Sequence, residues 1–243
     1  MDTSQVVFSD DMITPLASVL VNRLTGSRTI ITRKMQTPPS LTYDQKLKLD
    51  DLAERLIASE EPVTILIDGH EAEISEYLIK KLPHAKVVMD GGSLRASNIK
   101  LAAWTDYFVV SEHFARDYMS YRSLSTEADI KAALIELNKI CRGEAFITLG
   151  EKGCAFLKSG MLQIVPSWLC NAVDTTGAGD VFHGAFTYGV HYSWHIDNII
   201  LFASLTAAIS IEKKGVRESM PDLAVVHHSL NSYERNLKQY FEE

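Results

Sequence analysis

Two acidic residues enclose a glycine-rich stretch at Asp174–Asp180, with the sequence D-T-T-G-A-G-D. Gly177 and Gly179 allow a tight turn whose backbone stays open to a ligand. The apolar residues from Val181 onward predict a helix. Because the start of a helix leaves N–H groups unpaired and carries partial positive charge, this turn would aim several amides at one anion. Such a site suits the oxygens of a phosphoryl group during its transfer.

Asp180 stands at the start of the same predicted helix. A carboxylate there can accept the proton of an alcohol while the alcohol oxygen attacks phosphorus. The alternative is a plain turn in which Asp180 only caps the helix. The two glycines bracket a single small residue and acids flank them on both sides, which favours the catalytic interpretation.

Residues 41–243 must supply the scaffold, because helical and β patterns alternate there. Strands alternating with helices predict βαβ crossovers and a mainly parallel sheet with helices on both faces. Ligands of such sheets bind beyond the carboxyl ends of the strands, so Asp68 is predicted to face a substrate. Asp90–Gly92 is interpreted as a strand-end turn, with a functional role near a substrate as the alternative. The predicted strands are Val63–Ile67, Lys86–Met89, Tyr107–Val110 and Ala145–Leu149, with a hairpin at Cys154–Leu157 and Leu162–Val165.

Residues 1–40 form a distinct β-rich segment with short runs at Gln5–Phe8, Ala17–Asn22 and Thr29–Thr32. Three short strands without a helix make a poor core of their own. We therefore expect a small sheet that packs on another surface, such as a lid or a partner. The predicted organisation is a β lid of residues 1–40 and an α/β core of residues 41–243.

Composition excludes several classes of function. The net charge is -7, with 31 acidic and 24 basic residues, which argues against nucleic-acid binding. The sequence has no apolar run of about 18 residues, so no membrane span is expected. Asp2, Asp10 and Asp11 argue against a signal peptide. Three cysteines without a CxxC motif indicate reduced thiols and a cytoplasmic protein.

Two nucleotide-binding motifs are missing from the sequence. There is no Gly-x-x-x-x-Gly-Lys-[Ser/Thr] motif, so this is not a P-loop kinase. No Gly-x-Gly-x-x-Gly follows an early strand, which disfavours a dinucleotide-dependent oxidoreductase.

The glycine-rich stretch resembles the second signature of ribokinase-like (PfkB) carbohydrate kinases, D-T-x-G-A-G-D-x-F-x-x-A, which the sequence matches from Asp174 to Ala185 without a gap. This resemblance implies a three-layer αβα sandwich with a mainly parallel sheet and a small β lid. It implies ATP-dependent phosphoryl transfer to a sugar hydroxyl, with Mg²⁺ carried by the nucleotide and Asp180 as the general base. The implied anion hole is the backbone of Gly177, Ala178 and Gly179. His183 occupies a position that the family leaves variable.

The same resemblance assigns a nucleotide site to two further segments. Ile147–Cys154 resembles the strand end that contacts the nucleotide, and Phe202–Ser204 resembles the helix that walls the adenine pocket. The implied nucleotide-binding residues are Thr148, Gly150, Lys152, Gly153 and Ser204.

A monovalent cation is a further implication of the resemblance. In relatives that bind K⁺, oxygens from the loop after this helix join the positions of Asp174 and Thr176. Hard oxygen ligands fit a group I cation, and the alternative is an empty or water-filled pocket. The loop-side positions would be Ser210, Lys213, Gly215 and Ser219.

The sequence departs from the family where many members carry Asn-x-x-Glu, which is tied to the metal–phosphate water network. Ser111 stands for the Asn and Phe114 for the Glu. The ketohexokinase branch departs at the same place, and Ile67–His70 resembles a segment of that branch. Glu112 is a candidate for the Mg²⁺ network, and its alternative is an ordinary acid at a helix start.

Leu16–Ile31 resembles the strands that cover the sugar in this family. Related lids pair with each other, which implies a homodimer through residues 1–35. The family opens with core strands and a double-glycine signature that have no counterpart here, so an N-terminally truncated member is expected. Two hypotheses follow. One is a kinase that binds a sugar and ATP, and the other is a catalytically impaired nucleotide-binding or dimerisation remnant.

Overall fold

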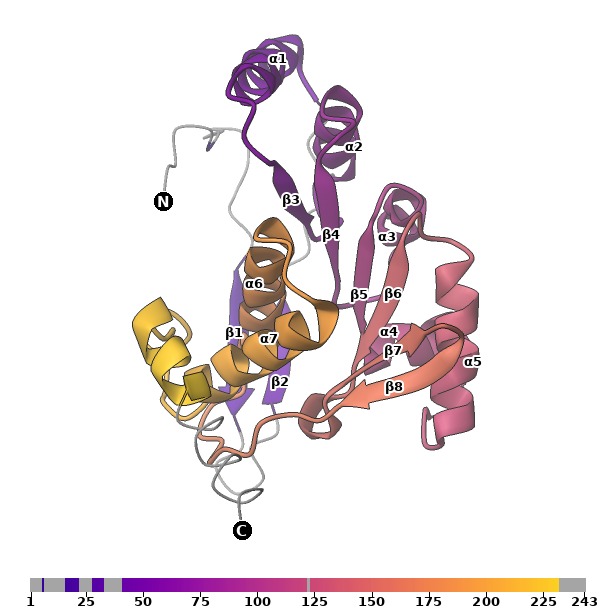
Figure 1. The fold of residues 1–243 in the computed structure, drawn as a ribbon, viewed down its shortest axis with the longest axis vertical. Helices are drawn as coiled ribbons and strands as arrows, with labels where there is room; N and C mark the ends of the chain where they lie inside the picture. Colours follow the sequence, from indigo (N-terminus) through magenta and orange to yellow (C-terminus); the bar gives the residue numbers. More distant parts are fainter. Residues whose placement is uncertain (1–5, 7–15, 22–27, 33–40, 122, 232–243) are drawn as a thin grey trace.

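The computed structural model describes residues 6, 16–21, 28–32, 41–121 and 123–231. A six-stranded sheet in the order β3-β4-β5-β6-β7-β8 forms its centre (Figure 1). The first four strands are parallel, and β7 and β8 continue the sheet as an antiparallel hairpin. The predicted α/β fold with a mainly parallel sheet is therefore confirmed. The strands are β3 (Thr64–Ile67), β4 (Lys86–Gly91), β5 (Tyr107–Ser111), β6 (Glu144–Thr148), β7 (Cys154–Lys158) and β8 (Met161–Val165).

Helices cover both faces of this sheet. On one face Leu101 of α3, Phe114 of α4 and Leu134 of α5 pack on strand residues such as Val110. On the other face α6 and α7 pack on Val88 and its neighbours. Because side chains alternate between the two faces of a strand, each buried strand is apolar throughout. The helices are α1 (Tyr43–Ala58), α2 (Ala72–Lys81), α3 (Ala96–Ala102), α4 (Glu112–Tyr118), α5 (Glu127–Asn138), α6 (Ala178–His191) and α7 (Ile196–Ser210).

Local sequence signals set several helix starts. Thr42 caps α1 in a capping box, in which it accepts a hydrogen bond from the Gln45 amide and the Gln45 side chain accepts one from the Thr42 amide. Thr126 and Asp129 form the same motif at α5. These caps satisfy amide groups that a helix start otherwise leaves unpaired.

Strand β4 is longer than the sequence predicts. Asp90 and Gly91 belong to the strand and pair with Val109 and Val110 of β5, so the interpretation of Asp90–Gly92 as a strand-end turn is wrong for its first two residues. Asp and Gly are disfavoured in strands, which explains the error. A Cβ atom on Gly91 would lie 2.5 Å from Cγ1 of Val110, so close packing between the strands requires a glycine here.

β1 (Ala17–Val21) and β2 (Arg28–Thr32) form a separate antiparallel ribbon with Ala17 opposite Thr32. Leu20 and Ile31 are 58% and 59% exposed. The two strands agree with the predicted runs, whereas the third run, Gln5–Phe8, lies outside the described residues apart from Val6. Within the described part of the chain, no helix combines the length and the apolar character that a membrane crossing requires.

Candidate active site

The glycine-rich stretch folds into a turn that leads directly into α6. Gly177 adopts a φ of 76°, in the left-handed region, and the helix begins at Ala178. The Ala178 amide donates a 3.3 Å hydrogen bond to the Thr175 carbonyl. The amides of Gly179 and Asp180 have no acceptor among the residues that the structure describes. Two adjacent N–H groups at a helix start are thus available to an anion.

A cavity of about 400 Å³ opens beside this turn, at the carboxyl ends of β3 and β4. It brings together Asp180 and Asp68, the two acidic side chains that the sequence assigns to base and substrate roles. It also contains Asp90, which the sequence places in a strand-end turn, and His183, which stands at a position that the resembling family leaves variable. The residues that line it are Leu66, Ile67, Asp68, Ser75, Asp90, Asp180 and His183.

His183 is 3% exposed and lies between α6 and the sheet. Its Nδ1 atom is 2.7 Å from the carbonyl oxygen of Gly179 and 3.3 Å from Oδ2 of Asp90. Its Nε2 atom is 3.1 Å from the carbonyl oxygen of Val109. A histidine three residues after Asp180, on an otherwise apolar helix face, is the signal by which the sequence could have marked this position.

The pKa of Asp90 is raised above its ordinary value of 3.8. Burial is the largest cause, because it disfavours the charged carboxylate. The His183 charge lowers this pKa, whereas the nearby carboxylates of Asp180 and Asp68 raise it further. The cavity therefore holds three acids close enough to influence one another.

This shift predicts how stability depends on pH. Between 3.8 and the raised pKa, the folded protein keeps the proton of Asp90 where the unfolded chain has lost it. The contribution of Asp90 to the free energy of unfolding therefore falls as the pH rises through this range. The Asp90→Asn variant lacks this titration. We therefore expect the free energy of unfolding of the variant, minus that of wild type, to increase over the same pH range and then level off. Urea unfolding at a series of pH values measures the difference, and a difference that does not change with pH contradicts the prediction.

The structure brings part of the predicted cation site together. The carboxylate of Asp174 accepts hydrogen bonds from the amides of Thr176 at 3.0 Å and Gly215 at 3.2 Å. Ser219 donates a short hydrogen bond to the carbonyl of Gly215, so its hydroxyl is near the same loop. The hydroxyl of Ser210 instead bonds within α7, to the carbonyl of Ala207 at 2.7 Å. Lys213 is exposed in the loop between them. A group of oxygens of this kind suits a hard cation.

The predicted nucleotide residues from Thr148 to Gly153 lie at or just after the carboxyl end of β6, and Ser204 lies in α7. Gly150 begins a short 3₁₀ turn, Gly150–Lys152, in which Lys152 is exposed. Gly153 has a φ of 105°, and a Cβ atom there would lie 2.0 Å from the carbonyl oxygen of Val165. Packing against β8 therefore already requires a glycine at position 153. Thr148 donates a 3.4 Å hydrogen bond to the carbonyl of Val110, and Ser204 is buried in α7.

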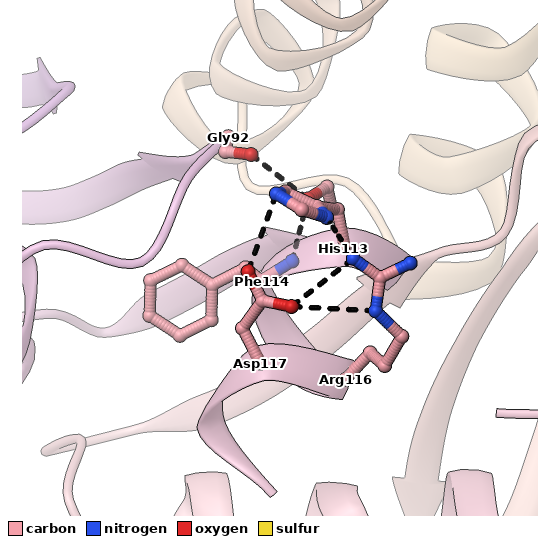
Figure 2. Close-up of polar contacts among 6 residues, drawn as sticks. Gly92, His113, Phe114, Arg116 and Asp117 are labelled. Atoms are coloured by element: carbon pink, nitrogen blue, oxygen red, sulfur yellow. Dashed lines mark hydrogen bonds and ion pairs between the residues drawn. The ribbon is translucent and has the colours of Figure 1, made fainter. Parts of the chain in front are cut away.

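The start of α4 is occupied by local hydrogen bonds. Ser111 caps the helix by accepting a 3.0 Å hydrogen bond from the Phe114 amide, and it donates one of 2.9 Å to the carbonyl of Gly92 (Figure 2). Phe114 is fully buried in the core, so it takes no part in a metal site. Glu112 lies in the first turn of α4, where the helix favours an acid.

An exposed polar group follows on α4. His113, Arg116 and Asp117 contact one another there, with 3.2 Å between Nε2 of His113 and Oδ2 of Asp117 (Figure 2).

Comparison with known proteins adds to this geometry. A family model described as pfkB family carbohydrate kinase matches residues 2–223. A ribokinase of Lactococcus lactis is 29% identical over 189 residues, which cover 78% of this chain and 60% of that protein. A ribokinase of Haemophilus influenzae is 30% identical over 143 residues, covering 59% of this chain and 46% of that protein. The chain thus spans 60% or less of the length of these two relatives.

Solved structures share the fold. The ribokinase from Giardia lamblia superimposes with a TM-score of 0.74 at 21% identity, over 90% of this chain and 72% of that one. The Arabidopsis thaliana ribokinase complexed with ribose and ATP gives a TM-score of 0.69 at 21% identity, over 88% of this chain and 68% of that one. At this identity, the comparison establishes the fold.

Proposed function

The chain belongs to the pfkB family of carbohydrate kinases, and from this membership we propose that it serves the transfer of the γ-phosphoryl group of ATP to a hydroxyl group of a sugar. The observation that carries the proposal is the position of Asp180. It lies in the first turn of α6, beside two amides available to an anion, and it lines a cavity that also holds Asp68. A base, an anion-binding turn and space for an acceptor are the parts that phosphoryl transfer needs.

Each part has a defined task in this proposal. Asp180 accepts the proton of the sugar hydroxyl as that oxygen forms a bond to the γ-phosphorus. The bond between the γ-phosphorus and the bridging oxygen breaks, and ADP leaves with the bonding electrons. The amides of Gly179 and Asp180 stabilise negative charge on the transferred group. Gly177 shapes the turn, whereas the amide of Ala178, which the resemblance includes in the anion hole, already donates to the carbonyl of Thr175. Asp68 orients the sugar by accepting a hydrogen bond from another hydroxyl.

Cations and the nucleotide have proposed positions as well. Mg²⁺ bound with ATP would neutralise charge on the phosphate oxygens, and Glu112 is its candidate protein contact. A monovalent cation such as K⁺ would bind near Asp174, Thr176 and the loop from Ser210 to Ser219. ATP would extend from the turn towards Thr148–Gly153 and Ser204. The Arabidopsis thaliana relative, whose structure holds ribose and ATP, supports this choice of ligands.

The second candidate is an impaired nucleotide-binding or dimerisation module. One observation favours it: β3 pairs only with β4 among the described residues, and Leu66 in the cavity wall is 43% exposed. An acceptor sugar binds more weakly beside a solvent-exposed cavity wall, because water competes for its hydrogen bonds.

The experiment that tests the proposal is a coupled assay of ATP consumption over a panel of pentoses and hexoses. Sugar-dependent ADP release is expected with at least one member of the panel. A melting temperature raised by MgATP and unchanged by NAD is expected as well, because a ligand that binds only the folded state stabilises it. ATP binding without turnover on any sugar would support the impaired module, and stabilisation by NAD alone would support an oxidoreductase.

We also propose a homodimer through residues 1–35. The ribbon of β1 and β2 supports it, because Leu20 and Ile31 expose apolar side chains that a second copy would cover. Light scattering is expected to give the mass of two 27.1 kDa chains, and Leu20→Lys is expected to shift it towards one chain. A wild-type protein that is monomeric at assay concentration contradicts this proposal.

A further inference from the structure

His183 is a buried titratable side chain to which the proposed reaction gives no task. Its ring lies beneath the first turn of α6, between that turn and the sheet. Three oxygen atoms from three elements surround its two ring nitrogens. They are the carbonyl of Gly179 and the carboxylate of Asp90 at Nδ1, and the carbonyl of Val109 at Nε2.

These contacts restrict the protonation of the ring. Carbonyl oxygens and ionised carboxylates only accept hydrogen bonds. A neutral imidazole has one N–H group and one lone pair, so one nitrogen would turn its lone pair towards an oxygen. The imidazolium form donates from both nitrogens and satisfies every partner. Asp90, 3.3 Å away, is then its counter-ion.

We propose that His183 is a positioning residue: as an imidazolium paired with Asp90, it holds the first turn of α6, and with it Asp180, against β4 and β5. Gly179 precedes Asp180 directly, so a hydrogen bond to its carbonyl fixes the backbone that carries the proposed base. The kinetic consequence rests on the proposed function, whereas the charge and the contacts of His183 do not.

The first turn of α6 needs this restraint, because side-chain packing does not supply one at Gly179. Gly179 has no side chain, and a Cβ atom built there would meet no atom within 4 Å. Packing therefore does not fix this part of the turn, and glycine backbones are otherwise free to move. The Nδ1 contact ties the turn to Asp90 on β4, and the Nε2 contact ties it to Val109 on β5.

The charges around His183 favour the same form. Asp90 from β4, Asp180 from α6 itself and Asp68 after β3 all line the adjoining cavity, and no lysine or arginine lines it within the described residues. A cation among three carboxylates reduces their mutual repulsion. Removing the cation would leave the partly buried carboxylate of Asp90 without its partner, which is the costly arrangement.

The protonation is tested directly by nuclear magnetic resonance. Protein labelled with ¹⁵N-histidine gives correlations between ring nitrogens and ring protons that separate an imidazolium from either neutral tautomer. The His183 signals are identified by their absence from His183→Asn. At neutral pH the wild-type signals are expected to be those of an imidazolium, and Asp90→Asn is expected to introduce a neutral form. A neutral tautomer in the wild-type protein overturns the proposal, whether or not the protein turns over a sugar.

The positioning role is tested by kinetics. His183→Leu keeps much of the volume but no donor, so a displaced turn is expected to lower kcat by roughly 100-fold with little change in the KM for ATP. His183→Asn retains a donor and is expected to recover part of this loss. The matched control is His191→Leu at the other end of α6, which is expected to keep wild-type kcat. Unchanged kcat in a folded His183→Leu variant overturns the positioning role. If that variant does not fold, the NMR experiment on the wild-type protein still tests the proposed imidazolium form of His183.

Discussion

Asp180→Asn is expected to lower kcat for ATP-dependent sugar phosphorylation by about 100- to 10,000-fold, the usual range for the loss of a general base. The amide has the shape of the carboxylate, but it cannot take the proton of the attacking hydroxyl. Asp180 lies in the cavity and in the first turn of α6. The coupled ADP-release assay with the best sugar of the panel measures kcat. A thermal-shift experiment measures whether the variant still binds ATP.

The chain offers a matched control for this change. Asp197 occupies the first turn of the neighbouring helix α7, as Asp180 does in α6, but it forms an exposed 3.3 Å ion pair with Lys158. Asp197→Asn is expected to keep full activity and to change stability by less than about 1 kcal/mol, because exposed ion pairs contribute little. Equal activity of Asp180→Asn and wild type would remove Asp180 from the mechanism while leaving the family membership untouched.

Gly177→Ala is expected to be the most damaging conservative change to the turn. Its φ of 76° is a conformation that alanine adopts only with strain, and the new Cβ atom would lie 2.5 Å from Cγ1 of Val216. To relieve the overlap, the Val216 side chain must rotate or its loop must shift. We expect a loss of about 1–3 kcal/mol in the free energy of unfolding, as for overpacked sites, together with a large loss of activity.

Gly184→Ala is the control for Gly177→Ala. Gly184 lies inside α6, and a Cβ atom there would meet nothing within 4 Å. Alanine is the better helix former, so this variant is expected to gain about 0.5–1 kcal/mol. Urea unfolding of the two variants gives both free energies, and a Gly177→Ala protein as stable as wild type contradicts the prediction.

Local sequence signals predicted most of the fold. β-branched runs such as Val63–Ile67 identify the parallel strands, because a strand buried on both faces is apolar throughout. Thr42 marks the start of α1 by its own side chain, and the glycine turn before α6 is set by residues within a few positions of one another. The strand, the helix start and the glycine turn are all present in the structure, although β3 begins at Thr64, one residue after the start of the predicted run.

The parts of the candidate site that were missed depend on contacts between distant segments. His183 is 74 residues from Val109, and only the packing of α6 on the sheet brings them together. Asp90 faces the cavity because β4 continues past Met89, which β propensity alone does not indicate. The hydroxyl of Ser111 likewise reaches the carbonyl of Gly92 only because β4 and β5 lie side by side.

The hydrogen bond from Gly215 to Asp174, and the closeness of Val216 to Gly177, have a consequence for ligand binding. Both join the loop after α7 to the residues that open the glycine turn. We therefore expect a cation bound at this loop and a phosphate bound at the turn to affect each other's binding. Because linkage between binding sites is reciprocal, each would change the affinity of the other by the same factor.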